Sequence, residues 1–154
     1  MKNLWMTFAA LLLLSAPTYA AVDTNMSFPI MLSVFIPCAA GGVGEVVTLN
    51  GNLHVLISTT VNGNHISSDM HFQPQGITGV GSVSGDKYQG TGITRFSFEA
   101  DVAGFPFIQT MVNNFKIIGQ GSGNNILVHE NLHVTVNANG TVTASVDNFS
   151  AECK

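Results

Sequence analysis

The clearest evidence for the fold is the stretch Glu45–Phe72, EVVTLNGNLHVLISTTVNGNHISSDMHF. Before the Asn62-Gly63 pair, apolar side chains recur at every second position, as in a strand with one buried face. After that pair the alternation resumes through Ile66, Met70 and Phe72. Asn-Gly between two alternating runs is a strong signal for a tight hairpin turn. The sequence therefore predicts a β-hairpin here.

The register of this hairpin follows from its turn. A two-residue loop made of Asn62-Gly63 sets Val55 opposite Met70, and Leu53 opposite Phe72. The apolar side chains of both strands then share one face, which a slip of one residue would reverse. The agreement of the two faces favours this register.

Two more hairpins are expected downstream. A Gly85-Asp86 turn is predicted to pair Val83 with Tyr88. A three-residue loop, 138–140, is predicted to join strands 126–136 and 141–149, with Gly140 in the left-handed conformation. That loop pairs Val136 with Val142, and Val134 with Ala144. A further alternating strand is expected over residues 105–118.

These patterns together predict an all-β chain with seven or eight antiparallel strands in an up-and-down meander. Such a sheet protects its edges by closing on itself or by packing against another sheet. We expect a closed or nearly closed barrel, with a β-sandwich as the alternative. Residues 21–154 are expected to form one domain.

Residues 1–20 have the features of an export signal. A charged start, Lys2, precedes the apolar run Leu4–Leu14, and small residues Thr18 and Ala20 occupy the positions that a signal peptidase recognises. This run is too short to span a bilayer, which needs about 20 residues. We expect a secreted or periplasmic protein with no membrane span after cleavage.

The two cysteines, Cys38 and Cys153, are expected to form a structural disulfide. Export places them in an oxidising compartment, and they stand near opposite ends of the domain. Redox chemistry favours closely spaced pairs, which the sequence lacks.

Charge excludes one class of partner. Outside the leader the chain has four Lys and Arg against nine Asp and Glu. A nucleic-acid surface needs clustered cations to neutralise phosphate. Nucleic acid is therefore not an expected partner.

The string His129-Glu130-Asn131-Leu132-His133 matches the zinc-protease pattern H-E-x-x-H. That pattern requires a helix, which places residues four apart on one face. Here the string lies in an alternating strand, where four residues span about 13 Å and one ion is out of reach of both imidazoles. We predict a strand and no protease site.

The predicted hairpin places His54 directly opposite His71 on the outward face. Cross-strand neighbours have Cβ atoms about 5 Å apart, so two imidazoles can share a metal ion. These histidines are the candidate metal site, beside the alternative that they belong to a solvated polar ladder.

The candidate ligand site consists of one carboxylate and a strip of glycines. Glu130 shares the predicted inward face with Val128 and Leu132; the structural alternative is that it lies near an open end of the sheet or is hydrogen-bonded to Asn148. The predicted pairing of Gly81 with Gly90, and of Gly79 with Gly92, leaves sheet without side chains, where either a ligand or the chain's own aromatics can lie.

These features lead to a functional hypothesis: an exported, non-enzymatic binding protein for a small, mostly apolar ligand. A structural or interaction module that binds another surface protein is the alternative, and an enzyme using Glu130 is a third hypothesis. No catalytic residue and no cofactor is assigned.

Overall fold

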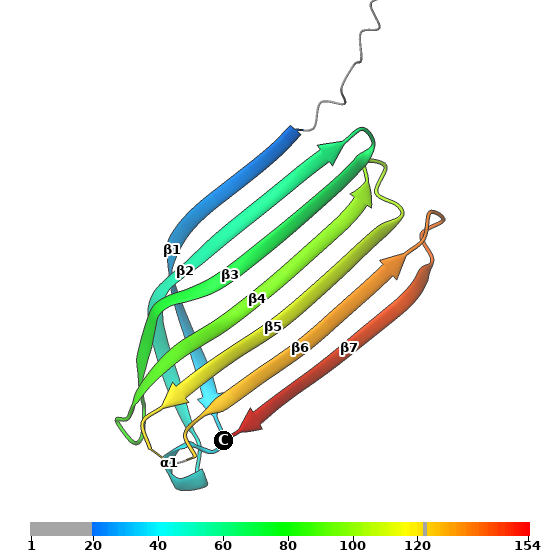
Figure 1. Cartoon of the computed structure of the whole chain (residues 1–154). Coiled ribbons are helices and arrows are strands. Elements are labelled where there is room, and N and C mark those ends of the chain that lie inside the picture. Colours follow the sequence, from blue (N-terminus) through cyan, green and yellow to red (C-terminus); the bar gives the residue numbers. More distant parts are fainter. Residues whose placement is uncertain (1–19, 122) are drawn as a thin grey trace, which may run out of the picture.

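A computed structural model describes residues 20–121 and 123–154. Seven antiparallel strands form one sheet in which every strand pairs with its sequence neighbours (Figure 1). The strands are β1 (Ala20–Ile36), β2 (Glu45–Asn62), β3 (His65–Gly81), β4 (Lys87–Asp101), β5 (Phe107–Gly119), β6 (Ile126–Val136) and β7 (Val142–Cys153), and the short α1 (Ala39–Gly42) joins β1 to β2. The predicted all-β antiparallel meander is confirmed.

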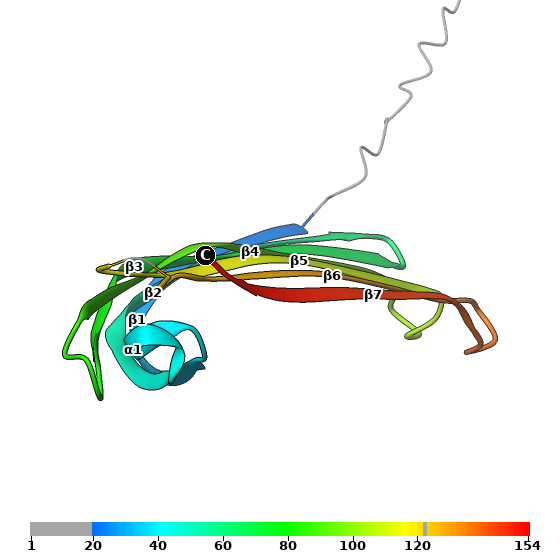
Figure 2. The same ribbon diagram turned by 90° about the horizontal axis from the view of Figure 1, so that it is seen from below.

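The predicted closure of the sheet into a barrel is not confirmed. Over the described residues the ladder runs from β1 to β7 and does not continue from β7 back to β1, and there is one sheet rather than two. Figure 2 shows how the sheet is bent: one half is nearly flat, and at the other end β1 and β2 fold back beneath it beside α1. Residues 1–19 of the predicted leader lie outside the described residues, and Ala20 begins β1.

Glycines and register shifts mark the bend in neighbouring strands. The β2–β3 ladder shifts between Asn50 and Asn52, and the β3–β4 ladder shifts between Phe72 and Thr78. An extra residue of this kind bends and twists a strand. At Gly51 a Cβ atom would lie 2.6 Å from the Cα of Ile77, so only glycine lets β2 and β3 approach this closely.

The core lies at the folded-back end, because only there does the sheet have two layers. Its buried side chains come from β1, β2, α1 and the facing parts of β3 to β6: Ile36, Ala39, Val47, Leu49, Ile77, Tyr88, Ile117 and Ile126. The same alternation of apolar residues continues into the flat half, where most side chains are half-buried and Val55, Ala100 and Val136 are buried. The sheet thus has a packed end and an open end.

The register of the first hairpin differs from the prediction by two residues. Gly63, with φ +58°, takes the first position of the turn, so Asn62 pairs with His65 and Val55 pairs with Phe72. A glycine at this position suits a turn that requires positive φ. The predicted pairing of Val55 with Met70 is wrong, but an even shift keeps every side chain on its predicted face.

The turn predicted for the second hairpin is wrong. Val80 pairs with Lys87 and Gly79 with Tyr88, so the loop spans six residues, 81–86, instead of the predicted two. Its backbone is held by a buried carboxylate, described below, which the local turn chemistry of Gly85-Asp86 does not reveal.

The third hairpin is partly as predicted. Val136 pairs with Val142, and Gly140 has φ +80°. A register shift between Thr135 and Val136 then sets Val134 opposite Ser145, not Ala144. Because the shift is odd, β7 beyond it turns its residues to the opposite faces from those predicted. Val146 thus leaves the apolar face and Asp147 joins it.

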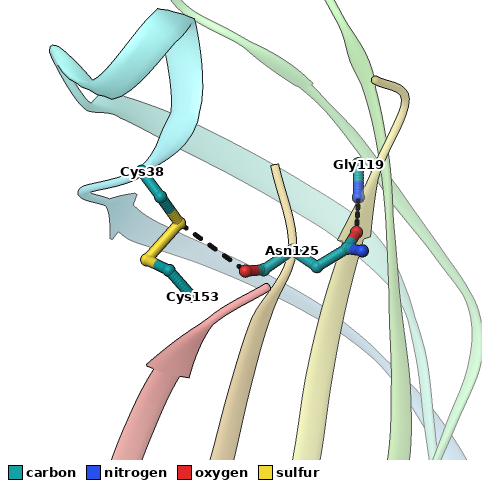
Figure 3. The surroundings of a disulfide bond; sticks show 4 residues. All are labelled: Cys38, Gly119, Asn125 and Cys153. Carbon is teal, nitrogen blue, oxygen red and sulfur yellow. Dashed lines mark hydrogen bonds between the residues drawn. A yellow bond between two sulfur atoms is a disulfide. The ribbon is translucent and has the colours of Figure 1, made fainter. Parts of the chain in front are cut away.

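The predicted disulfide is confirmed. Cys38, which follows β1, is bonded to Cys153 at the end of β7, with 6.0 Å between Cα atoms (Figure 3). Beside it, Asn125 exchanges two backbone hydrogen bonds with Lys154, and its Oδ1 accepts a bond from the Gly119 amide. The bridge ties the edge strand β7 to the folded-back end.

Candidate ligand site

A pocket of about 340 Å³ lies where the folded-back end meets the flat half of the sheet. Its walls come from six strands, β1 to β6, and α1 contributes no lining residue. The lining residues are Ile30, Leu32, Leu53, Phe72, Pro74, Ile77, Gly92, Ile93, Thr94, Asn113, Phe115 and Val128. Aliphatic and aromatic side chains dominate this lining, as in sites for apolar small molecules.

Two polar side chains interrupt the apolar wall. The Thr94 hydroxyl donates a hydrogen bond of 2.9 Å to Oδ1 of Asn113, its neighbour across β4 and β5. Within the described residues no hydrogen bond uses the Asn113 Nδ2 group. A ligand carbonyl or hydroxyl has a donor available there.

Only one of the four predicted glycines lines this pocket. Gly92 does so, with φ +117° and its Cα against the Asn114 carbonyl of β5. The space beside the other three is filled by the chain itself: Thr48 backbone at Gly79, the Glu45 carboxylate at Gly81 and the Ile77 side chain at Gly90.

The predicted glycine pairings are also wrong. Gly79 lies opposite Tyr88 on β4 and opposite Leu49 on β2, while Gly90 and Gly92 lie opposite Ile117 and Phe115 of β5. The four glycines share a face as expected, but they are displaced along the strands because the 81–86 loop is longer than predicted. They do not form one strip.

Glu130 lies near the pocket but outside its lining. It is half-buried on the apolar face, opposite Asn113 of β5 and Phe149 of β7. The predicted neighbour Asn148 instead opposes Asn131, because of the register shift in the third hairpin. Glu130 is not the only carboxylate on this face, since Asp147 lies opposite Leu132.

Glu45 is the carboxylate that the sequence reasoning missed. It is only 2% exposed and begins β2 on the same face as Val47 and Leu49. Its oxygens accept hydrogen bonds from the Ser84 amide (3.0 Å), the Ser84 hydroxyl (2.7 Å) and the Val83 amide (2.9 Å). The sequence signal was available: Glu45 continues the period-two run of buried apolar positions.

These bonds change the acidity of the cluster. The Ser84 amide and hydroxyl, aided by the Val83 amide and the Tyr88 hydroxyl, stabilise the charged carboxylate more than burial disfavours it. The pKa of Glu45 is therefore lowered from 4.5 to about 2. Burial, then the nearby carboxylate, raises the pKa of Tyr88. Glu45 is a charged structural anchor of the 81–86 loop.

The structure does not set the two candidate metal ligands opposite each other. His54 lies opposite Gln73 and shares a 2.8 Å hydrogen bond with Asn25, whereas His71 lies opposite Leu56 and Arg95. The described residues contain no group of three or more His, Cys, Asp or Glu side chains arranged to hold a metal ion.

The H-E-x-x-H segment is a strand, as predicted. His129 and His133 lie on one face of β6, hydrogen-bonded to Asn114 (2.6 Å) and Thr110 (2.9 Å) respectively. Glu130 lies on the other face. The geometry of a helical zinc protease site is absent from this segment.

A second cleft, of about 440 Å³, lies on the polar face of the flat half. It includes Asp69, His71, Arg95 and Thr110. The Nε2 atom of His71 is buried there without a hydrogen-bond partner in the described part of the chain. Because Asp69 and Arg95 are exposed, this cleft is open and solvated rather than an enclosed site.

Among the described residues no helix is both long and apolar enough to cross a membrane. No protein-family model, no curated protein and no solved structure matches the chain.

Proposed function

We propose that this chain is an exported, non-enzymatic protein that binds a small, mostly apolar molecule. The observation that carries the proposal is the pocket of about 340 Å³ at the junction of the packed and open ends. Its walls are nearly all hydrocarbon, so burying an apolar ligand there removes apolar surface from water. Asn113 supplies one polar contact that would orient the ligand.

The pocket's surroundings also support binding. It opens onto the apolar face of the flat half, which lets a ligand longer than the pocket continue along the sheet. The Cys38–Cys153 bridge fixes the folded-back end that forms one wall. A disulfide of this kind is characteristic of exported proteins, and it is compatible with a secreted or periplasmic location.

An environment-sensitive apolar dye tests the proposal. Val128→Phe fills the pocket from β6, whereas Leu127→Phe adds the same ring at the neighbouring position, which points to the opposite face. Val128→Phe should weaken dye binding at least tenfold, and Leu127→Phe should leave it unchanged. Equal binding by both variants would contradict a ligand site here.

An interaction module is the second candidate, favoured by the β7 edge. Every residue of β7 is exposed, including Val146 (47%) and Phe149 (63%), and over the described residues its outer edge pairs with no strand. Such an edge can add a strand from another protein. Replacing Ser145 with Pro, at a position whose backbone amide points away from β6, would abolish such binding while leaving dye binding intact.

A further inference from the structure

The flat half of the sheet leaves its apolar face uncovered. Figure 2 shows this half as a single layer, with only the loops at its open end, between β4 and β5 and between β6 and β7, curling beneath it. Its apolar side chains are mostly half-buried by their own neighbours: Val55, Ile57, Met70, Phe72, Phe96, Phe98, Phe107, Met111, Leu132 and Val134. A sheet with one apolar face normally buries it against another layer.

The chemistry of this face resembles the centre of a protein interface. Phe and Met are common in such centres and charged residues are depleted. The cations of the neighbouring strands, Lys87, Arg95 and Lys116, all alternate to the other face. Its carboxylates, Glu130 and Asp147, lie on the two strands at one edge, where an interface has its polar rim.

The size of the face suits a second protein layer. Seven strands spaced about 4.8 Å apart cover roughly 34 Å, and the nine residues 53–61 of β2 extend about 30 Å. The area is therefore roughly 1,000 Å², comparable with the ~800 Å² that each partner buries in a stable interface.

The shape of the molecule leaves room for a second copy of the chain on this face. The folded-back end projects on the same side as the uncovered face (Figure 2). It is a layer packed on β3 to β6, so it projects by about one sheet-to-sheet spacing, ~10 Å. A second sheet packed on the flat half at that spacing would therefore lie in the same layer as the folded-back end, next to it. If two copies are related by a two-fold axis that runs across the strands, the flat half of each copy takes this place beside the folded-back end of the other.

We propose that a second copy of this chain covers the face, so that the flat halves of two copies pack together in a two-layer sandwich. Each folded-back end then lies beyond the open end of the other copy's flat half. This goes beyond the proposed ligand binding, which concerns a pocket within one chain. The pocket opens at the margin of the paired faces, so the dimer would also cover a bound ligand.

Sedimentation equilibrium in detergent-free buffer tests the dimer. Phe96 and Ser97 are neighbours on β4 that point to opposite faces, Phe96 onto the apolar one. Phe96→Lys should raise the dimer dissociation constant about 30-fold or more, the effect of losing a central contact. Ser97→Lys carries the same new charge and should leave the dissociation constant unchanged.

Three results would overturn the proposal. The first is a wild-type chain that stays monomeric at 100 μM or more, a result that does not depend on any variant folding. The second is a dimer that Phe96→Lys leaves intact. The third is a monomeric chain of residues 21–154 that carries lipid in native mass spectra; the occupant of the face would then be a lipid. The dimer and the ligand site can be tested separately. A Val128→Phe variant that loses dye binding but still forms the dimer would show that the two do not depend on each other.

Discussion

The hydroxyl of Tyr88 donates a 2.8 Å hydrogen bond to the carboxylate of Glu45, in the buried interior of the packed end. The two residues stand on β2 and β4, which are separated by β3 in the sheet order. The bond thus joins the folded-back start of β2 to the strand that leaves the 81–86 loop. It makes the bend of the sheet and the conformation of that loop dependent on one charged group.

Acid should weaken the fold through Glu45. Its pKa is about 2 in the folded chain, below its ordinary value of 4.5, so the charged form stabilises the folded state. This stabilisation is complete above about pH 4.5 and is lost as the pH falls toward 2. The thermal midpoint should therefore drop across that window, measured by circular dichroism.

Glu45→Gln removes the titrating group while keeping the side-chain shape. The variant should melt at a lower temperature than wild type at pH 7, and its melting temperature should fall less between pH 4.5 and 2. Parallel curves for the two proteins would show that Glu45 does not link stability to pH.

The disulfide should contribute strongly to stability, because it closes a loop of 115 residues. Cys38→Ser combined with Cys153→Ser should lower the free energy of unfolding by about 4–5 kcal/mol. Urea denaturation measures this loss, and reduced wild type should behave like the double variant. A free energy of unfolding that does not change would mean that the bridge does not constrain the unfolded chain.

Two glycines should differ in their tolerance of a methyl group. At Gly63 a Cβ atom meets nothing within 4 Å, so Gly63→Ala should cost about 1–2 kcal/mol for φ +58° alone. At Gly92 the Cβ would overlap the Asn114 carbonyl oxygen, and φ is +117°. Gly92→Ala should therefore cost about 3 kcal/mol or more in urea denaturation. Equal costs would indicate that the strands separate freely at Gly92.

The alternation of side chains was sufficient to predict most of the strands, but β1, Ala20–Ile36, was not among them. Ile126–Val136 was predicted with its observed bounds, and β2 to within one residue. Period two is local information, and side chains far apart in sequence do not alter it. The meander followed because short turns join antiparallel neighbours.

Registers were less predictable because turns depend on contacts that are distant in sequence. Glu45, 38 residues before Val83, holds the loop that the sequence reasoning treated as a two-residue turn. The bend had the same limitation, because at Gly51 strand β2 lies against Ile77 of β3, which is 26 residues later in the sequence.

The candidate site was predicted only in part. Gly92 lines the observed pocket, whereas Gly79, Gly81 and Gly90 do not. Glu130 lies on the predicted face beside the pocket. Its expected neighbour was wrong, because a single extra residue in β7 reverses the faces of that strand.

The histidine register leads to a prediction about zinc. Because His54 opposes Gln73 and not His71, the two imidazoles are not positioned as a directly opposed pair. Calorimetric zinc titration of wild type and His71→Ala should give indistinguishable, weak binding. Tight binding that disappears in His71→Ala would revive the two-histidine site.

The most direct measurement is native mass spectrometry of the protein purified from its own source without detergent. We expect the chain to carry a small apolar molecule. The Val128→Phe variant, prepared in the same way, should have lost it, whereas Leu127→Phe should retain it. A wild-type chain that carries no bound molecule, or a bound molecule that all three proteins retain equally, would contradict a ligand site at the junction of the packed and open ends.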